Sequence, residues 1–285
     1  MVNNVRQIVN IKNNILALCL LGLCSLSFSD TANLDGRHLN ADEESNNEEV
    51  YDAASLKREQ WRGAYQSQKL SLDKTLGGRI PEGFKAGLTT LDSQRQFRSD
   101  RAIMGTLMPG AGLDFNQTVK RSTFKNGMVE VELAYRLKRV LKEPVADVAS
   151  LKRLVDVVAP AVELPDLNFN IEGAPTVFDI VRANVAAHRF VVGSPTSISS
   201  LDVDTITVGL HIDDQPIFSA QSNAVIGGQW QMLLELINDR IDQGWIIYPD
   251  QWLLTGALGK MHPLSAGRYY VYFGELGELS FLIEP

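Results

Sequence analysis

Acidic and apolar residues alternate in the segment Gly127-Met-Val-Glu-Val-Glu-Leu-Ala-Tyr-Arg-Leu137, and no other feature constrains the fold as strongly. Successive side chains of a β-strand point to opposite faces, so a strand here places Glu130 and Glu132 on one face and the intervening valines on the other. Two carboxylates so placed lie about 7 Å apart and repel each other unless water or a cation separates them. A third carboxylate, Glu163, follows the apolar run Val157–Val162.

These glutamates have two interpretations. Alternating valine and glutamate is typical of a half-exposed strand with its charges in water, and Glu163 can be a loop residue before Pro165. Three carboxylates without a nearby histidine or cysteine are also the ligands of a hard cation such as Mg²⁺, which keeps several of its waters. Spacing alone favours the exposed strand.

The composition indicates a globular protein. The chain has 285 residues, of which 45% are hydrophobic and 21% charged, and this balance suits one sizeable core. Its formal charge of −7, without a cluster of basic residues, argues against nucleic acid as a partner.

The N-terminus has the pattern of an export signal. Arg6 and Lys12 precede the short apolar run Ile15–Leu23, and small residues follow up to Ser29. We expect a secretory signal peptide over residues 1–29 and a protein exported to the periplasm, with no membrane association after cleavage. The alternative is a membrane anchor made by the same segment, although its apolar run is short for a span. Both cysteines lie within it, so the mature chain cannot use a thiolate nucleophile.

The rest of the chain divides into three predicted parts. Residues 30–52 are rich in Asn, Asp and Glu and predict an acidic, disordered leader. Residues 53–90 predict a small helical subdomain, whose helix over 53–76 ends at Gly77-Gly78. We expect a metal-binding catalytic domain over residues 91–285. The predicted inward positions of the first helix are Leu56, Trp61, Tyr65 and Leu72.

Strands and dispersed helices in the last part indicate an α+β fold rather than a doubly wound α/β fold. The predicted helices cover residues 148–158, 176–187 and 230–243. The predicted strands are Met128–Leu137, Phe190–Val192, Ile206–Ile212, Gln251–Leu254, Tyr269–Phe273 and Glu278–Ile283.

Several familiar chemistries have no motif here. The chain lacks a Gly-x-Ser-x-Gly nucleophile elbow, and Gly256–Lys260 is too short for a phosphate loop. The four histidines show no pairing at metal-ligand spacing, so each is better explained as a structural or surface residue.

Seven further motifs stand in a characteristic order along residues 55–284. They are Ala64–Gln68, Phe84–Thr90, Val129–Ala134, Pro160–Asp166, Ala183-Asn184 with Phe190–Gly193, Leu253–Ala257 and Phe273–Gly277. In this order they resemble the 2-keto-4-pentenoate hydratase and 2-oxohepta-3-ene-1,7-dioate hydratase group of the fumarylacetoacetate hydrolase superfamily. The resemblance implies a mixed β-sheet roll or barrel, of the kind seen in that superfamily's C-terminal domain.

The resemblance also implies a metal site. Its Mg²⁺ or Mn²⁺ would be held by Glu130, Glu132 and Glu163 and would chelate the carboxylate and keto oxygen of a small 2-keto acid. The same ion would relieve the repulsion between the carboxylates.

Other roles come from the resemblance residue by residue. The group's catalytic lysine falls on Lys85, and a supporting catalytic role falls on Asp166, three residues after a metal ligand. Thr89, Thr255 and Gly256 match the substrate-binding positions. A homo-oligomer is also implied.

Three positions depart from the group's pattern. Ile103 and Ala183 stand where the group has acids, so two carboxyl groups expected near the pocket are missing. The third departure is the turn Gly227-Gly-Gln229, where the group usually has Gly-His-Pro.

These observations predict a divalent-metal-dependent hydratase acting on a 2-hydroxydienoate or related 2-keto acid. The alternatives are a 2-keto acid decarboxylase, an acylpyruvate-type carbon–carbon hydrolase, and an exported protein that binds a keto acid without turning it over.

Overall fold

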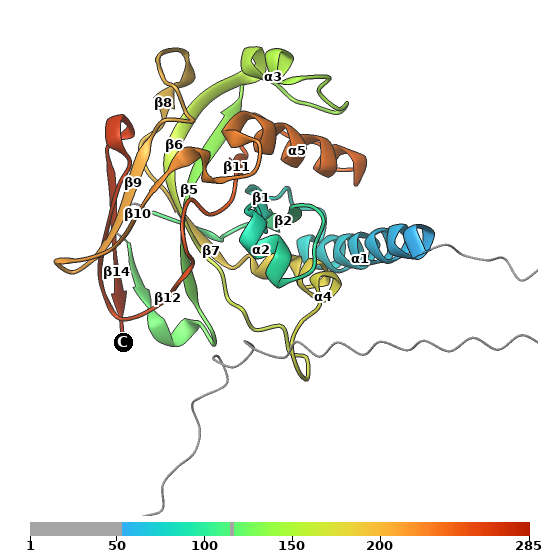
Figure 1. Ribbon diagram of the computed structural model, residues 1–285, viewed down its shortest axis with the longest axis horizontal. Coiled ribbons are helices and arrows are strands. Elements are labelled where there is room, and N and C mark those ends of the chain that lie inside the picture. The colour runs from blue at the N-terminus through green and yellow to red at the C-terminus, as the bar shows by residue number, and fades with distance from the viewer. Residues whose placement is uncertain (1–52, 115–116) are drawn as a thin grey trace, which may run out of the picture. The chain divides into compact units, whose positions relative to one another are not determined.

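The computed structural model describes residues 53–114 and 117–285, and these residues belong to one compact unit (Figure 1). The predictions for residues 1–29 and 30–52, a signal peptide and an acidic leader, lie outside the described residues. Within the described part, every helix is too short or too polar to span a lipid bilayer.

Helix α1 (Ala53–Leu76) has the predicted bounds and ends where Gly77 and Gly78 take left-handed φ angles of 56° and 86°. Trp61, Tyr65 and Leu72 are buried as predicted. The prediction for Leu56 is wrong, since this side chain is 48% exposed near the start of the helix.

A mixed sheet of nine strands carries most of the predicted site residues. Its main strand order is β2-β1-β11-β5-β6-β7-β3, with β12 paired to β5 and β8 paired to β6. The β1–β11 and β3–β7 pairs are parallel, and the other pairs are antiparallel. The strands are β1 (Gly83–Gly87), β2 (Ile103–Leu107), β3 (Gly112–Leu113), β5 (Met128–Leu137), β6 (Val155–Leu164), β7 (Arg189–Val192), β8 (Thr196–Ser197), β11 (Trp252–Leu254) and β12 (His262–Pro263).

A second sheet has the order β10-β9-β13-β14-β4. Its strands are β4 (Thr118–Lys120), β9 (Thr207–Ile212), β10 (Gln215–Gln221), β13 (Gly267–Tyr272) and β14 (Glu278–Glu284). The remaining α-helices are α2 (Leu91–Gln96), α3 (Val148–Leu154), α4 (Val177–Arg182) and α5 (Gly228–Asp242). Figure 1 shows the curled strands β5, β6, β9, β10 and β14 on one side of this unit and α1, α2, α4 and α5 on the other.

The apolar face of β5 lies in the main core. Val129, Val131 and Leu133 are buried there with residues of the second sheet and of α5, such as Leu210 and Leu233. The opposite face of β5 therefore carries the two glutamates, as the alternation predicts. The α+β class and the predicted curled, mixed sheet are confirmed.

The three helices predicted after residue 91 have other bounds in the structure, and the predicted strands other than β5 differ from the observed ones by one or two residues. The helix predicted over 148–158 ends at Leu154, because the valine-rich run from Val155 pairs with β5 as strand β6. The helix predicted over 176–187 ends at Arg182, and the helix predicted from residue 230 begins at Gly228. Residues 53–90 are not a separate subdomain, because β1 lies inside the large sheet between β2 and β11.

Candidate metal centre

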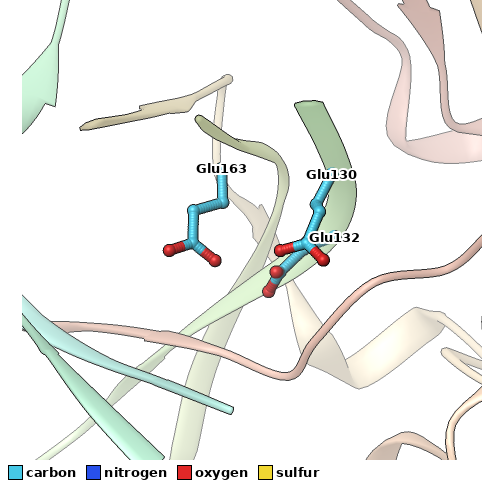
Figure 2. A group of neighbouring side chains, drawn as sticks. All are labelled: Glu130, Glu132 and Glu163. Carbon is cyan, nitrogen blue, oxygen red and sulfur yellow. The ribbon is translucent and has the colours of Figure 1, made fainter. Parts of the chain in front are cut away.

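The three predicted metal ligands meet across a pair of neighbouring strands. In the antiparallel register of β5 and β6, Glu130 lies directly opposite Glu163, and Glu132 follows on the same face of β5. One carboxylate oxygen from each glutamate lies within 4.8 Å of the others (Figure 2). Glu132 and Glu163 are fully buried, whereas Glu130 is half-buried. The interpretation of β5 as a strand with its charges in water is therefore wrong. The interpretation of Glu163 as a loop residue is also wrong, because it lies in β6.

Three of the four carboxylate oxygens of Glu132 and Glu163 lack a well-aligned hydrogen-bond donor among the described residues. Glu132 Oε2 accepts the backbone N–H of Gly256 at 2.8 Å, but Glu132 Oε1 and both oxygens of Glu163 have no well-aligned donor among the described residues. Burial, followed by the neighbouring glutamates, raises the pKa of Glu132 well above its usual value. Burial is also the main cause that raises the pKa of Glu163 to about 7. Free carboxylate oxygens with so little water access suit a hard divalent cation.

Lys85 reaches the cluster from β1. Its Nζ lies 2.7 Å from Glu163 Oε2, and it donates a hydrogen bond to the backbone carbonyl of Val185 at 3.2 Å. The contact with Glu163 is a short ion pair rather than a well-aligned hydrogen bond. Burial alone would lower the pKa of Lys85, but the three glutamates together raise it above its usual value. The ammonium is therefore charged at neutral pH.

The predicted substrate-binding residues lie beside Glu132. Gly256, with φ of 91°, donates to this glutamate, and a Cβ on Gly256 would lie 2.4 Å from the Thr89 side chain. Thr89 therefore packs directly on the Gly256 backbone. The Thr255 hydroxyl is engaged elsewhere, since it donates to Gln229 Oε1 at 2.6 Å. The substrate-binding roles of these three residues stay predictions.

Asp166 lies just beyond the end of β6. Its carboxylate accepts the backbone N–H groups of Lys125 and Asn126 at 3.1 and 2.7 Å, and its own N–H donates to the carbonyl of Ala186. These bonds fasten the chain next to the Glu163 strand, and the carboxylate is not part of the three-glutamate cluster. The catalytic role assigned to Asp166 stays a prediction, and its observed contacts are structural.

The positions that lack the group's acids differ from each other in the structure. Ile103 is fully buried, and its Cγ1 and the Lys85 Nζ both lie 3.7 Å from the place of a Cβ on Gly87, so Ile103 sits beside the lysine. Ala183 is exposed at the end of α4, directly before the turn that contacts Lys85, and the expectation that an acid here would line the pocket stays a prediction.

Two structural features near the site were not predicted from the sequence. Asn184 and Val185 form a left-handed turn whose carbonyl contacts Lys85, and the motif Ala183-Asn184 was its only sequence signal. Gln229 accepts hydrogen bonds from both Thr255 and Tyr135, and this buried network cannot be read from the residue types alone.

Histidines take no part in the cluster. None of the three described histidines (His188, His211 and His262) contributes a ligand atom to it, and His38 lies outside the described residues. His188 packs edge-on against Phe124, and burial lowers its pKa.

No family model matches the chain. It is 28% identical over 225 residues to 2-keto-4-pentenoate hydratase 1 of Dechloromonas aromatica, an alignment that covers 77% of this chain and 84% of the relative. Its structure superimposes with a TM-score of 0.71 on 4-oxalocrotonate decarboxylase from Pseudomonas putida G7, complexed with magnesium and adipate. That match has 23% identity and covers 78% of this chain and 86% of the other.

The chain is similar in sequence to 2-keto-4-pentenoate hydratases and shares the fold of solved members of the fumarylacetoacetate hydrolase superfamily. The same fold occurs in fumarylpyruvate hydrolase from Pseudomonas aeruginosa in complex with Mn²⁺ and pyruvate, with a TM-score of 0.55 and 13% identity over 70% of this chain and 88% of that one. The resemblance predicted from the ordered motifs is thus confirmed. The proteins similar in sequence to this chain include hydratases and decarboxylases. Solved members carry divalent ions, in agreement with the acidic cluster of this chain.

Proposed function

We propose that this protein is a divalent-metal-dependent hydratase, a hydro-lyase that adds water to a 2-hydroxydienoate or related 2-keto acid. The observation that carries the proposal is the charged Lys85 ammonium held 2.7 Å from Glu163 within a buried cluster of three carboxylates. Such a site combines a place for a cation with a proton donor in one water-poor environment. The names of the relatives, which are mostly hydratases of such acids, support the same reaction.

The resident ion is proposed to be Mg²⁺ or Mn²⁺, held by Glu130, Glu132 and Glu163. A bound ion of this kind supplies Lewis-acid polarisation of a 2-keto oxygen. The chain supplies the rest. The Gly256 N–H orients Glu132, and the Lys85 ammonium can stabilise an enolate oxygen or deliver a proton to the adjacent carbon.

A decarboxylase is the second candidate, and Ile103 favours it. Hydration requires a group that activates water, whereas loss of CO₂ from a 2-keto acid requires an electron sink and a proton donor. The apolar Ile103 beside Lys85 leaves the lysine without a carboxyl partner other than the cluster itself. The decarboxylase therefore needs only groups that this site contains.

The other two alternatives have less support. A carbon–carbon hydrolase needs a base that activates water, and no described histidine joins the cluster. The missing acids at Ile103 and Ala183 favour a non-catalytic binding protein, but the retained Lys85 and the three-glutamate cluster oppose it.

The test is the ultraviolet absorbance of 2-hydroxypenta-2,4-dienoate incubated with purified protein and Mg²⁺. We expect metal-dependent loss of the diene band, abolished in Glu132→Gln and retained in the exposed-site control Glu278→Gln. Incubation with a 2-hydroxymuconate-type dioate, with CO₂ as the readout, separates the decarboxylase. Absence of both reactions together with tight keto-acid binding would support the binding protein instead.

Export and assembly are further proposals that rest on the sequence. Secretion predicts a mature N-terminus at Asp30 in the periplasmic fraction, whereas an anchor predicts an intact chain in the membrane fraction. A homo-oligomer predicts a mass that is a multiple of the mature chain in light scattering.

A further inference from the structure

A left-handed turn lies against the catalytic lysine. The 3₁₀ turn η2 (Asn184–Ala186) has φ angles of 56°, 54° and 57° at three successive residues, none of which is glycine. Residues with a Cβ avoid this region, and a β-branched residue such as Val185 avoids it most. Such backbone persists only where its surroundings hold it, and it concentrates at functional sites.

Each residue of the turn is hydrogen-bonded to another part of the fold. Asn184 bonds through its side chain to Thr106 of β2, Val185 offers its carbonyl to Lys85, and Ala186 offers its carbonyl to the N–H of Asp166. Two backbone hydrogen bonds close the turn. The Ala186 N–H donates to the Ala183 carbonyl, and the Ala187 N–H donates to the Asn184 carbonyl.

The side-chain amide of Asn184 fixes this turn to the sheet through two hydrogen bonds with the backbone of Thr106, which we call the clasp. Its Nδ2 donates to the Thr106 carbonyl and its Oδ1 accepts the Thr106 N–H, both at 2.8 Å. A backbone unit bonded through both of its polar groups cannot rotate away without losing two hydrogen bonds.

Two glycines let the turn approach the lysine closely. A Cβ on Gly105 would lie 2.9 Å from the Asn184 carbonyl oxygen and 3.1 Å from Lys85 Cδ. A Cβ on Gly87 would lie 2.7 Å from Val185 Cγ1. Strand β1, which carries Lys85, and its neighbour β2 therefore have no side chain at the two points where the turn approaches.

We infer that Asn184 is a positioning residue for Lys85, acting through the carbonyl of Val185. The described partners of the Lys85 ammonium are the Glu163 carboxylate and the Val185 carbonyl, so loss of the carbonyl leaves it a single fixed partner and makes the side chain more mobile and more accessible. The Val185 carbonyl holds one donor, so the Lys85 Nζ stays at the edge of the cluster, beside Glu163, where it can serve a substrate. This inference rests on the proposed function only for the catalytic role of Lys85.

The chain offers a matched control. Asn238 of α5 makes the same two bonds to a backbone unit, donating to the Val145 carbonyl at 2.9 Å and accepting the Val145 N–H at 2.8 Å. Neither bond involves the three glutamates or Lys85. Asn238→Ala therefore removes the same kind of clasp without releasing the lysine.

The experiment compares Asn184→Ala, Asn184→Asp and Asn238→Ala in the full protein. The first readout is the rate at which acetic anhydride acylates Lys85, followed by peptide mass spectrometry and normalised to the exposed Lys74. We expect acylation to rise about ten-fold or more in Asn184→Ala, less in Asn184→Asp, which keeps one clasp bond, and not in Asn238→Ala. Because this readout needs no turnover, it tests the inference even if the proposed reaction fails.

The second readout is steady-state kinetics with Mn²⁺. Misplacement of a proton donor predicts a fall in kcat of about ten-fold or more for Asn184→Ala, with KM and the Kd for Mn²⁺ nearly unchanged. Unchanged Lys85 acylation in Asn184→Ala, or an equal rise in Asn238→Ala, overturns the inference. If Asn184→Ala does not fold, the same two criteria apply to Asn184→Asp.

Discussion

The Nζ of Lys85 lies 2.7 Å from Oε2 of Glu163, deep inside the protein and between strands that are far apart in the chain. A buried ion pair gives little net stability by itself, because desolvation of both charges offsets their attraction. Here one ammonium stands against three carboxyl groups, so fewer positive than negative charges are available when all three are ionised. A divalent cation would neutralise the excess negative charge. Binding of such a cation explains why the fold keeps buried carboxyl groups whose desolvation costs stability.

Removal of the lysine separates its catalytic effect from its structural one. In Lys85→Met we expect kcat to fall by about 10²–10⁴-fold, the range for loss of a general acid. The metal-free variant should lose about 3–5 kcal/mol of stability, because Glu163 is left buried without its partner. Added Mn²⁺ should restore most of that stability but none of the activity. Chemical denaturation with and without Mn²⁺, alongside kinetics, measures both effects.

The stability of the metal-free protein should fall as the pH rises from 5 to 8. Burial raises the pKa of Glu132 well above its reference of 4.5 and that of Glu163 from 4.5 to about 7. In this window the folded state binds more protons than the unfolded state, so a rising pH favours unfolding. The pKa of Lys85 is also raised, but its stabilising charge is present throughout the window.

Urea denaturation in EDTA should therefore show a loss of roughly 2–4 kcal/mol between pH 5 and pH 8. Saturating Mn²⁺ should flatten or reverse this dependence, because the ion binds the deprotonated carboxylates. The double variant Glu132→Gln, Glu163→Gln is the control and should show little slope. A metal-free wild-type protein that gains stability over this range would contradict the burial of these charges.

Gly256 should tolerate no side chain. In Gly256→Ala the new Cβ would meet Thr89 at 2.4 Å, and the turn would strain at φ of 91°. We expect a loss of about 2–4 kcal/mol and weaker binding of Mn²⁺, since the N–H that orients Glu132 must shift.

Gly78 is the matched control, because its φ is 86° and a Cβ there would meet nothing within 4 Å. Gly78→Ala should lose only about 1 kcal/mol through its backbone and should bind Mn²⁺ normally. Similar losses in both variants would show that the contact with Thr89 has no effect of its own.

Ile103 should influence the choice between the two candidate reactions. In Ile103→Asp a carboxylate would stand beside Lys85 and could activate water, so we expect the ratio of hydration to decarboxylation to rise by about ten-fold. Ile103→Leu keeps the apolar character and should leave the ratio unchanged. Product analysis by NMR of both substrates measures it, and an unchanged ratio in a folded Ile103→Asp protein would contradict the role given to this position.

The acidic cluster of three glutamates was predictable because its signals are local. A strand period of two placed Glu130 and Glu132 together, and an ordered set of motifs supplied Glu163 and Lys85. The clasp of Asn184 was not predictable, because Thr106 is 78 residues away and only the fold brings them together. The same holds for Gln229, whose partners Tyr135 and Thr255 lie on β5 and just after β11.

The fold was predicted best where periodicity was strong. The bounds of α1 and β5 were correct, since each has a clear pattern of buried positions. Strands β1, β2 and β6 are buried on both faces, and their continuous apolar or glycine-rich runs carry no alternation. Periodicity cannot identify such strands, and as a result the helix predicted over residues 148–158 extended into β6.

The most direct test of the central claim is a crystal soaked in MnCl₂ and measured at a wavelength where manganese scatters anomalously. The account predicts one strong anomalous peak about 2.0–2.3 Å from an oxygen each of Glu130, Glu132 and Glu163, with the Lys85 ammonium beside the ion. Absence of a peak at this cluster, with Lys85 still paired to Glu163 at saturating Mn²⁺, would contradict it.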